Sequence, residues 1–384
     1  MKAISASSHA ADAYRAGLEI GKVLAAINPE VVILFATIHY AESNELTEAI
    51  YDAIDNENLI LIGNTGDGYY ETHGASDHGV AAVGLNSEGA VTWSVNYEEG
   101  IREAPAQVTE RLLNRTLKTL GTTPPELLLL LSDFKTDASQ IEKIVESIEG
   151  IPIVGGLAAD DNLMADCALF VNKQCLRNAA ATLAIQGEIN FNISIGNNLT
   201  PVGKQGRIDA AEGASIFEIA GCSAMDFIEQ ETGKPVLQSD RGLTSLTIID
   251  PDQPFIKRLR SIVPDFSTTE RSLGLYGGIE QGKSVQVCVA QPQELIAEVY
   301  QIAKRHKEHG FEPSAAIIIS CAGRKSLLGE DVNHEIKALS EQFGITFPIV
   351  GFPSFGEIGP LKNAEGYTRN LFHNMTYVLL LLGK

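Results

Sequence analysis

Short apolar runs alternate with stretches of helical periodicity along this chain, and one order of elements occurs three times. In the first segment, an apolar run at residues 31–36 precedes a helical pattern at 44–54 and a second apolar run at 59–63. Short continuous apolar runs predict buried strands, and apolar residues at helical spacing predict an amphipathic helix. This segment therefore predicts a β-α-β unit.

Two later segments repeat the same order. Their strand, helix and strand fall at residues 127–131, 138–148 and 151–155, and at residues 315–320, 331–343 and 347–351. A crossover helix makes its two strands parallel neighbours, because such crossovers keep one hand. We interpret the three segments as diverged β-α-β-loop repeats.

Strand-like residues follow each unit, at residues 79–97, at 168–184 with 191–195, and at 375–382. They can return antiparallel beside the parallel pairs, so the expected fold class is α/β, with mixed parallel and antiparallel sheets flanked by helices. The 384 residues exceed what one core usually serves. We expect two domains, residues 1–210 with two repeats and residues 211–384 with one.

Residues 1–27 lack the basic and apolar regions of a secretion signal, and their apolar side chains predict a helix instead. These side chains are Ala10, Tyr14, Leu18, Val23 and Ile27. The apolar runs at 127–131 and 377–382 are shorter than a membrane-spanning helix needs. We therefore expect no membrane partner.

The charge composition argues against a nucleic-acid partner. The chain has 29 Lys and Arg against 49 Asp and Glu, a formal net charge of -20. Nucleic-acid binding rests on cationic side chains, so we expect no nucleic-acid partner. The basic run at residues 257–260 predicts a solvated edge or a subunit contact. Five scattered cysteines without a Cys-x-x-Cys pair predict a reducing compartment, and hence a cytoplasmic protein.

Glycines mark the loop after the second strand of each unit. The positions are Gly63 and Gly68 in the first loop, Gly155, Gly156 and Asp160 in the second, and Gly351 and Gly356 in the third. Glycine and aspartate tolerate left-handed backbone angles, so each loop can direct successive N–H groups at an anion or a carboxylate. The alternative is that these residues only allow a tight turn.

The third unit carries the most specific motif. Residues 351–360 read GFPSFGEIGP, residues 372–376 read FHNMT, and residues 321–324 read CAGR. These residues resemble the FIST C domain, and the first two glycine-rich loops are similar to the FIST N domain. The resemblance covers residues 29–382.

The resemblance implies a sensory pair of modules that binds a small ligand, with amino acids as the proposed class, and it implies no cofactor. In other architectures the pair is joined to a signalling output, so here we expect a separate signalling protein as partner. One departure is Tyr69, which follows Gly68 where an acidic residue is usual, matching Glu357 in the third loop. Ligand binding by the first loop is therefore in doubt.

Four polar residues are candidates for the ligand site. Arg324 could pair with a ligand carboxylate and Glu357 could accept from an ammonium group, which together would suit a zwitterion. The alternative is that Arg324 and Glu357 pair with each other or cap the local backbone. His373 and Asn374 could donate hydrogen bonds into the same pocket or serve the fold.

Two functions compete with ligand binding. Cys321 could act as a nucleophile with His373 as its base, although a buried cysteine that closes an apolar strand is the commoner case. An interaction scaffold is the second alternative. We expect a binding protein rather than an enzyme.

Two further sequence motifs carry weaker signals. Residues 277–284, GGIEQGKS, match a phosphate-binding loop, but a strand pattern follows where that loop requires a helix. We interpret this run as a hairpin turn. His73, Asp77 and His78 lie in a polar loop, for which we expect no metal.

Overall fold

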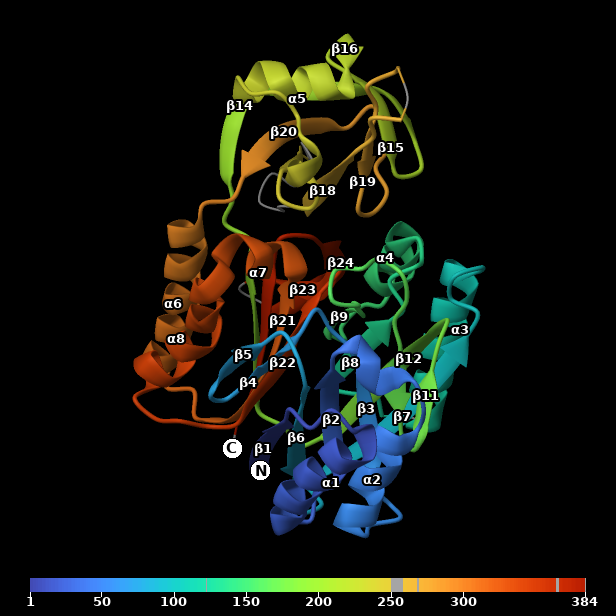
Figure 1. Ribbon diagram of the computed structural model, residues 1–384, viewed down its shortest axis with the longest axis vertical. Helices are drawn as coiled ribbons and strands as arrows, with labels where there is room; N and C mark the ends of the chain where they lie inside the picture. The colour runs from blue at the N-terminus through green and yellow to red at the C-terminus, as the bar shows by residue number, and fades with distance from the viewer. Residues whose placement is uncertain (122, 250–257, 268, 364–365, 384) are drawn as a thin grey trace.

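The computed structural model describes residues 1–121, 123–249, 258–267, 269–363 and 366–383. Within them, the strands form three six-stranded sheets and one seven-stranded sheet (Figure 1). Parallel and antiparallel pairs occur in the same sheets, so the predicted α/β class is confirmed. No described helix combines the length and the apolar character needed to cross a membrane.

Each of the three predicted β-α-β segments forms a parallel strand pair. The elements are β2 (Val31–Ala36), α2 (Glu45–Ile54) and β3 (Ile60–Thr65); β8 (Leu127–Ser132), α4 (Ala138–Glu146) and β9 (Ile153–Leu157); and β21 (Pro313–Cys321), α7 (Ala322–Leu328), α8 (His334–Phe343) and β22 (Ile349–Ser354). The first strand of each pair is buried on both faces, which explains its continuous apolar sequence. Descent from one repeat stays a prediction.

In each unit, one predicted returning strand lies antiparallel beside the parallel pair, whereas residues 91–99, 169–176 and 191–196 join the sheet of a different unit. An antiparallel strand flanks the first strand of each pair, namely β6 (Val80–Asn86), β12 (Ala179–Gly187) and β25 (Tyr377–Gly383). The outer edges are β1 (Lys2–Ser8), β7 (Val91–Glu99) and β13 (Phe191–Gly196). Further helices are α1 (Ala13–Leu24), α3 (Pro105–Thr119) and α6 (Pro292–Glu308).

A hairpin after each glycine-rich loop completes the sheet of a different unit. The hairpin of β4 (Tyr69–Glu71) and β5 (Gly74–Ser76) joins β22, that of β10 (Leu169–Val171) and β11 (Gln174–Leu176) joins β3, and that of β23 (Glu357–Asn363) and β24 (Gly366–His373) joins β9. The three units are therefore linked in a closed cycle. Strands from before and after residue 210 share two of these sheets.

The seven-stranded sheet forms a separate layer, which we call the cap (residues 200–289). Its strands are β14 (Thr200–Glu212), β15 (Ser215–Ile219), β16 (Cys222–Ser223), β17 (Ser245–Ile249), β18 (Arg258–Pro264), β19 (Leu273–Leu275) and β20 (Ser284–Val289). Helix α5 (Ala224–Thr232) covers one face, and the opposite side of the cap lies over α7 and β24 (Figure 1). The predicted domain boundary falls inside β14, the first strand of the cap.

The N-terminal segment differs from the predicted helix in two ways. Residues Lys2–Ser8 form a strand, and α1 begins only at Ala13. The buried face of α1 has small residues such as Gly17, whereas Tyr14 and Val23 of the predicted face are exposed. A Cβ at Gly17 would lie 2.4 Å from the carbonyl oxygen of Leu46. Close packing against α2 therefore decides which face is buried.

Close strand contact also explains one glycine in each unit. Gly63, Gly155 and Gly351 lie within strands, directly opposite Leu34, Leu130 and Ile318. A Cβ at Gly155 would stand 1.8 Å from the carbonyl oxygen of Leu130, and the other two glycines show the same contact. These glycines therefore serve strand pairing.

We predict that Gly155→Ala lowers the free energy of unfolding by about 2 to 3 kcal/mol, because the added methyl group meets rigid backbone. Gly84→Ala is the matched control, since the nearest atom to its Cβ would be a proline side-chain carbon at 3.2 Å. Urea unfolding of both variants tests this. Equal midpoints would show that the close contact imposes no constraint.

Candidate ligand-binding site

The three glycine-rich loops hydrogen-bond to one another. Asp67 N donates to Pro353 O at 3.0 Å, Ala159 N donates to Thr65 O at 2.8 Å, and Leu157 N donates to Gly356 O at 2.8 Å. Backbone N–H groups that were expected to face a ligand thus join the loops. The geometry favours the alternative in which these loops serve the fold.

Asp160 differs from its predicted role in the second loop. Its backbone is not left-handed, whereas that of Asp161, Asn162 and Met164 is. The Asp160 carboxylate instead accepts hydrogen bonds from the backbone N–H groups of residues 164, 165 and 166. It therefore holds a strained loop, residues 160–166, in one shape.

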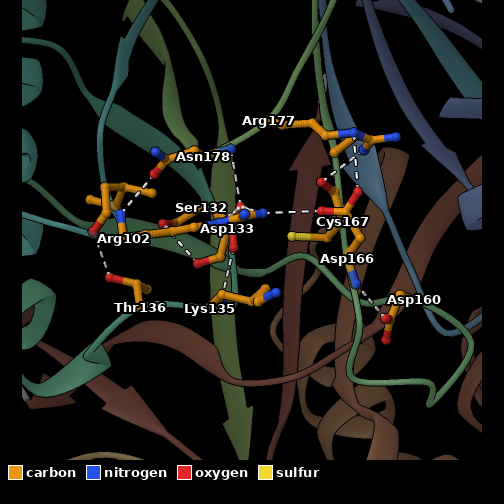
Figure 2. Close-up of polar contacts among 12 residues, drawn as sticks. Arg102, Ser132, Asp133, Lys135, Thr136, Asp160, Asp166, Cys167, Arg177 and Asn178 are labelled. Carbon is orange, nitrogen blue, oxygen red and sulfur yellow. Dashed lines mark hydrogen bonds and ion pairs between the residues drawn. The ribbon is translucent and has the colours of Figure 1, made fainter. Parts of the chain in front are cut away.

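An ion-pair network braces the far end of the same loop. Figure 2 shows Arg102 between Asp133 and Asp166, and Arg177 beside Asp166. Arg102 donates to Asp133 from Nε and Nη2 at 2.9 and 2.6 Å, and Asp166 pairs with both arginines at 3.1 Å. The Asp133 side chain is fully buried, so this network closes the end of β8 with protein groups.

A cavity of about 450 Å³ lies between the cap and the strand ends of the third unit. This size suits a small molecule. The cap contributes Gln238, Ser239, Arg241, Gly242, Leu243, Ser261 and Tyr276; the strained loop contributes Asn162, Leu163 and Met164; and the third unit contributes Cys321, Ala322, Gly323, Ser326, Ser354, Phe355 and Asn374.

Two predicted site residues, Cys321 and Asn374, line this cavity. Asn374 also joins the cap to the third unit, because its Oδ1 accepts from Ser261 N at 3.1 Å and its Nδ2 donates to His373 O at 3.1 Å. The cap residues were missed. Ser261 lies in strand β18 and the others lie in short turns, none within a recognisable motif, and only the tertiary fold brings them to the strand ends.

Arg324 lies outside the cavity lining. Its Nε donates to Glu335 at 2.8 Å with both side chains fully buried, and Tyr70 donates to the other oxygen of Glu335 at 3.2 Å. Among the described residues, Nη1 and Nη2 of Arg324 have no hydrogen-bond partner. The ion pair joins α7 to α8, so the fold uses Arg324, through Glu335 rather than Glu357.

Glu357 lies just behind the cavity wall. One carboxylate oxygen accepts from Ser354 Oγ at 2.6 Å, and the other accepts from Thr376 Oγ1 at 2.6 Å and from Thr376 N at 3.2 Å. Burial raises the pKa of Glu357 to about 7, against these hydrogen bonds, which lower it. Of the described residues that hydrogen-bond to the Glu357 carboxylate, only Ser354 lines the cavity, and Glu357 itself lies outside the lining.

The raised pKa of Glu357 predicts a specific pH dependence of stability. The folded protein binds a proton between pH 4.5 and about 7 that the unfolded chain releases, so this carboxyl group destabilises the fold as pH rises. The unfolding free energy of the wild-type protein minus that of the Glu357→Gln protein should fall by about 3 kcal/mol as the pH rises across that range. His373, whose pKa burial lowers to about 4, acts in the opposite sense in both proteins. A constant difference would disprove the shift.

The geometry offers no activation of Cys321. Burial and the nearby Glu357 raise the pKa of its thiol. His373 is buried, its Nε2 lies 3.3 Å from Gly359 O, and its Nδ1 has no partner among the residues that the structure describes. Neither nitrogen makes a described hydrogen bond to Cys321.

We predict slow alkylation of Cys321 by iodoacetamide at neutral pH, since the thiolate is the reactive form. Mass spectrometry of the labelled peptide, with the Cys321→Ser protein as its blank, measures the rate against a free cysteine peptide. Faster labelling than the free peptide would support the nucleophile hypothesis.

The residues of the phosphate-loop match do not form the predicted hairpin. Ser284 begins strand β20 as expected, but β20 pairs with β14 and β17, whereas β19 pairs with β18 and β15. The run 277–283 therefore crosses between strands that are not neighbours, because β17 and β18 lie between them.

The remaining charged candidates make contacts within the chain. In the basic run, Arg258 pairs with Glu146 and Arg260 with Glu142, while residue 257 lies outside the described residues. These pairs join the cap to α4. Asp77 pairs with Lys325 at 2.6 Å, and the His78 ring stacks on His39 with centroids 4.1 Å apart.

Two protein-family models match the chain. A family model for the FIST N domain matches residues 30–222, and one for the FIST C domain matches residues 224–360. The motif at residues 372–376 lies beyond that second range. No curated protein matches the chain.

Two solved structures match the chain distantly. T. maritima PurL complexed with ATP has a TM-score of 0.21 and 11% identity, covering 100% of this chain and 71% of that chain. T. maritima PurL complexed with FGAR has a TM-score of 0.23 and 8% identity, covering 99% and 72%. Similarity at this level carries no argument about fold or function.

Proposed function

This chain belongs to the FIST family, whose domains are associated with small-ligand sensing in signal transduction, and we propose that it binds an amino acid or a similar small metabolite as a sensor. The observation that carries the proposal is the cavity under the cap. It joins both matched domains, since the strained loop lies in one match and the cap turns and third-unit strand ends in the other.

The position of the cavity supports a sensory role. Ligands of open α/β sheets bind outside the carboxyl ends of strands, and Cys321 and Ser354 are the last residues of β21 and β22. A ligand here would contact the cap and the third unit together. Binding would thereby be coupled to the position of the cap, which a separate cytoplasmic signalling protein could detect.

Catalysis by Cys321 is the competing function. The raised pKa of its thiol and the contacts of His373 argue against it. A covalent adduct with substrate would indicate an enzyme, and ligand-induced stabilisation without turnover would indicate a sensor. If neither is observed, the interaction scaffold is the remaining hypothesis.

We expect a thermal-shift screen with common amino acids, related carboxylates and ATP to find a stabilising ligand among the first two classes. A ligand at 100 times its dissociation constant adds about 2.7 kcal/mol, which amounts to a few degrees. Ser326→Trp should abolish the shift by filling the cavity from an exposed helix position. Ser43→Trp, at an exposed position outside the lining, is the matched control. The proposal fails if Ser326→Trp keeps the full shift.

A further inference from the structure

The cavity differs from the rest of the chain in the sign of its charge. The chain has a formal net charge of -20. Among the described residues that line the cavity, Arg241 carries the one formal charge and no Asp or Glu occurs. A ligand in this cavity would therefore meet a cation and no carboxylate.

The carboxylates nearest to the cavity in sequence lie outside its lining. Asp160 accepts three backbone N–H groups, Asp240 accepts from Leu237 N at 2.7 Å, and Glu357 is held by Ser354 and Thr376. Asp161 also lies outside the lining, and its buried Oδ1 has no hydrogen-bond partner among the described residues. A ligand ammonium group would have no counter-ion in this cavity.

Arg241 is positioned to receive an anion. Its Nε donates to the Tyr276 hydroxyl group at 2.9 Å, and the guanidinium group lies 6.0 Å from the centre of the Tyr276 ring. Within the described part of the chain, Nη1 and Nη2 make no hydrogen bond to protein. One edge of the planar fork is thus fixed, and the other can form a bidentate pair with a carboxylate.

Apolar side chains form much of the remaining lining. Leu163 and Met164 come from the strained loop, Leu243 from the cap and Phe355 from the third unit. We propose that the cavity binds a small organic acid, with its carboxylate on Arg241 and an apolar body against these side chains, and that it does not select an α-ammonium group. This inference rests on the proposed function and narrows its ligand class.

The test compares acids with their α-amino counterparts by isothermal titration calorimetry on the full chain. The probes are 3-phenylpropionate against phenylalanine and 4-methylpentanoate against leucine, with 3-phenylpropionamide as the uncharged control. We expect the acids to bind more tightly than the amino acids and the amide. Arg241→Gln should weaken acid binding about 10- to 100-fold, because a charged hydrogen-bond donor is lost. The affinity of the Arg241→Lys protein for the acids should lie between those of the wild-type and Arg241→Gln proteins.

Arg305→Gln is the matched control, since it removes one positive charge from an exposed position on α6, outside the lining. Amino acids that bind as tightly as the acids, or equal effects of the two Gln variants, overturn this inference and leave the sensor proposal standing. Binding by neither series at millimolar concentration overturns both.

Discussion

A buried ion pair between Arg260 and Glu142 determines where the cap sits, and the cavity depends on that position. Arg260 is 1% exposed, its Nη2 lies 2.6 Å from Glu142, and its Nη1 donates to Phe372 O at 3.0 Å. Glu142 also accepts from Phe372 N at 3.2 Å. One interaction thus joins the cap, helix α4 of the second unit and β24. Removing either partner would leave a buried charge uncompensated, at a cost of about 3 to 5 kcal/mol.

Below the cap, the three units have different residues at corresponding strand ends. The position in question is three residues after the strand residue that pairs with Gly63, Gly155 or Gly351. It is occupied by Thr37, Asp133 and Cys321, respectively. Thr37 bonds to Gly79, and Asp133 is covered by Arg102, so protein groups satisfy both positions. Cys321 instead lines the cavity. The three hairpins, each paired with the sheet of a different unit, hold the units together. The strand end of the third unit lies beneath the cap.

The sequence predicted what depends on local pattern and missed what depends on long-range pairing. The parallel pairs were predicted because continuous apolar runs report burial on both faces, as in β8. Gly155 was interpreted as part of a ligand loop, because only the register with Leu130 reveals the close backbone contact. Arg324 was expected in the site because its partner Glu335, on the next helix, could not be identified from spacing. Arg241 was missed because it lies in a turn without a motif.

The central claim is that ligand binds between the cap and the strand ends of the third unit. Hydrogen–deuterium exchange of the full chain, with and without the most stabilising carboxylate, tests it most directly. The account predicts increased protection of both the cap turn at residues 238–243 and the strand-end segment at residues 354–356. Protection confined to the glycine-rich loop at residues 63–68, with the cap turn unchanged, would contradict it.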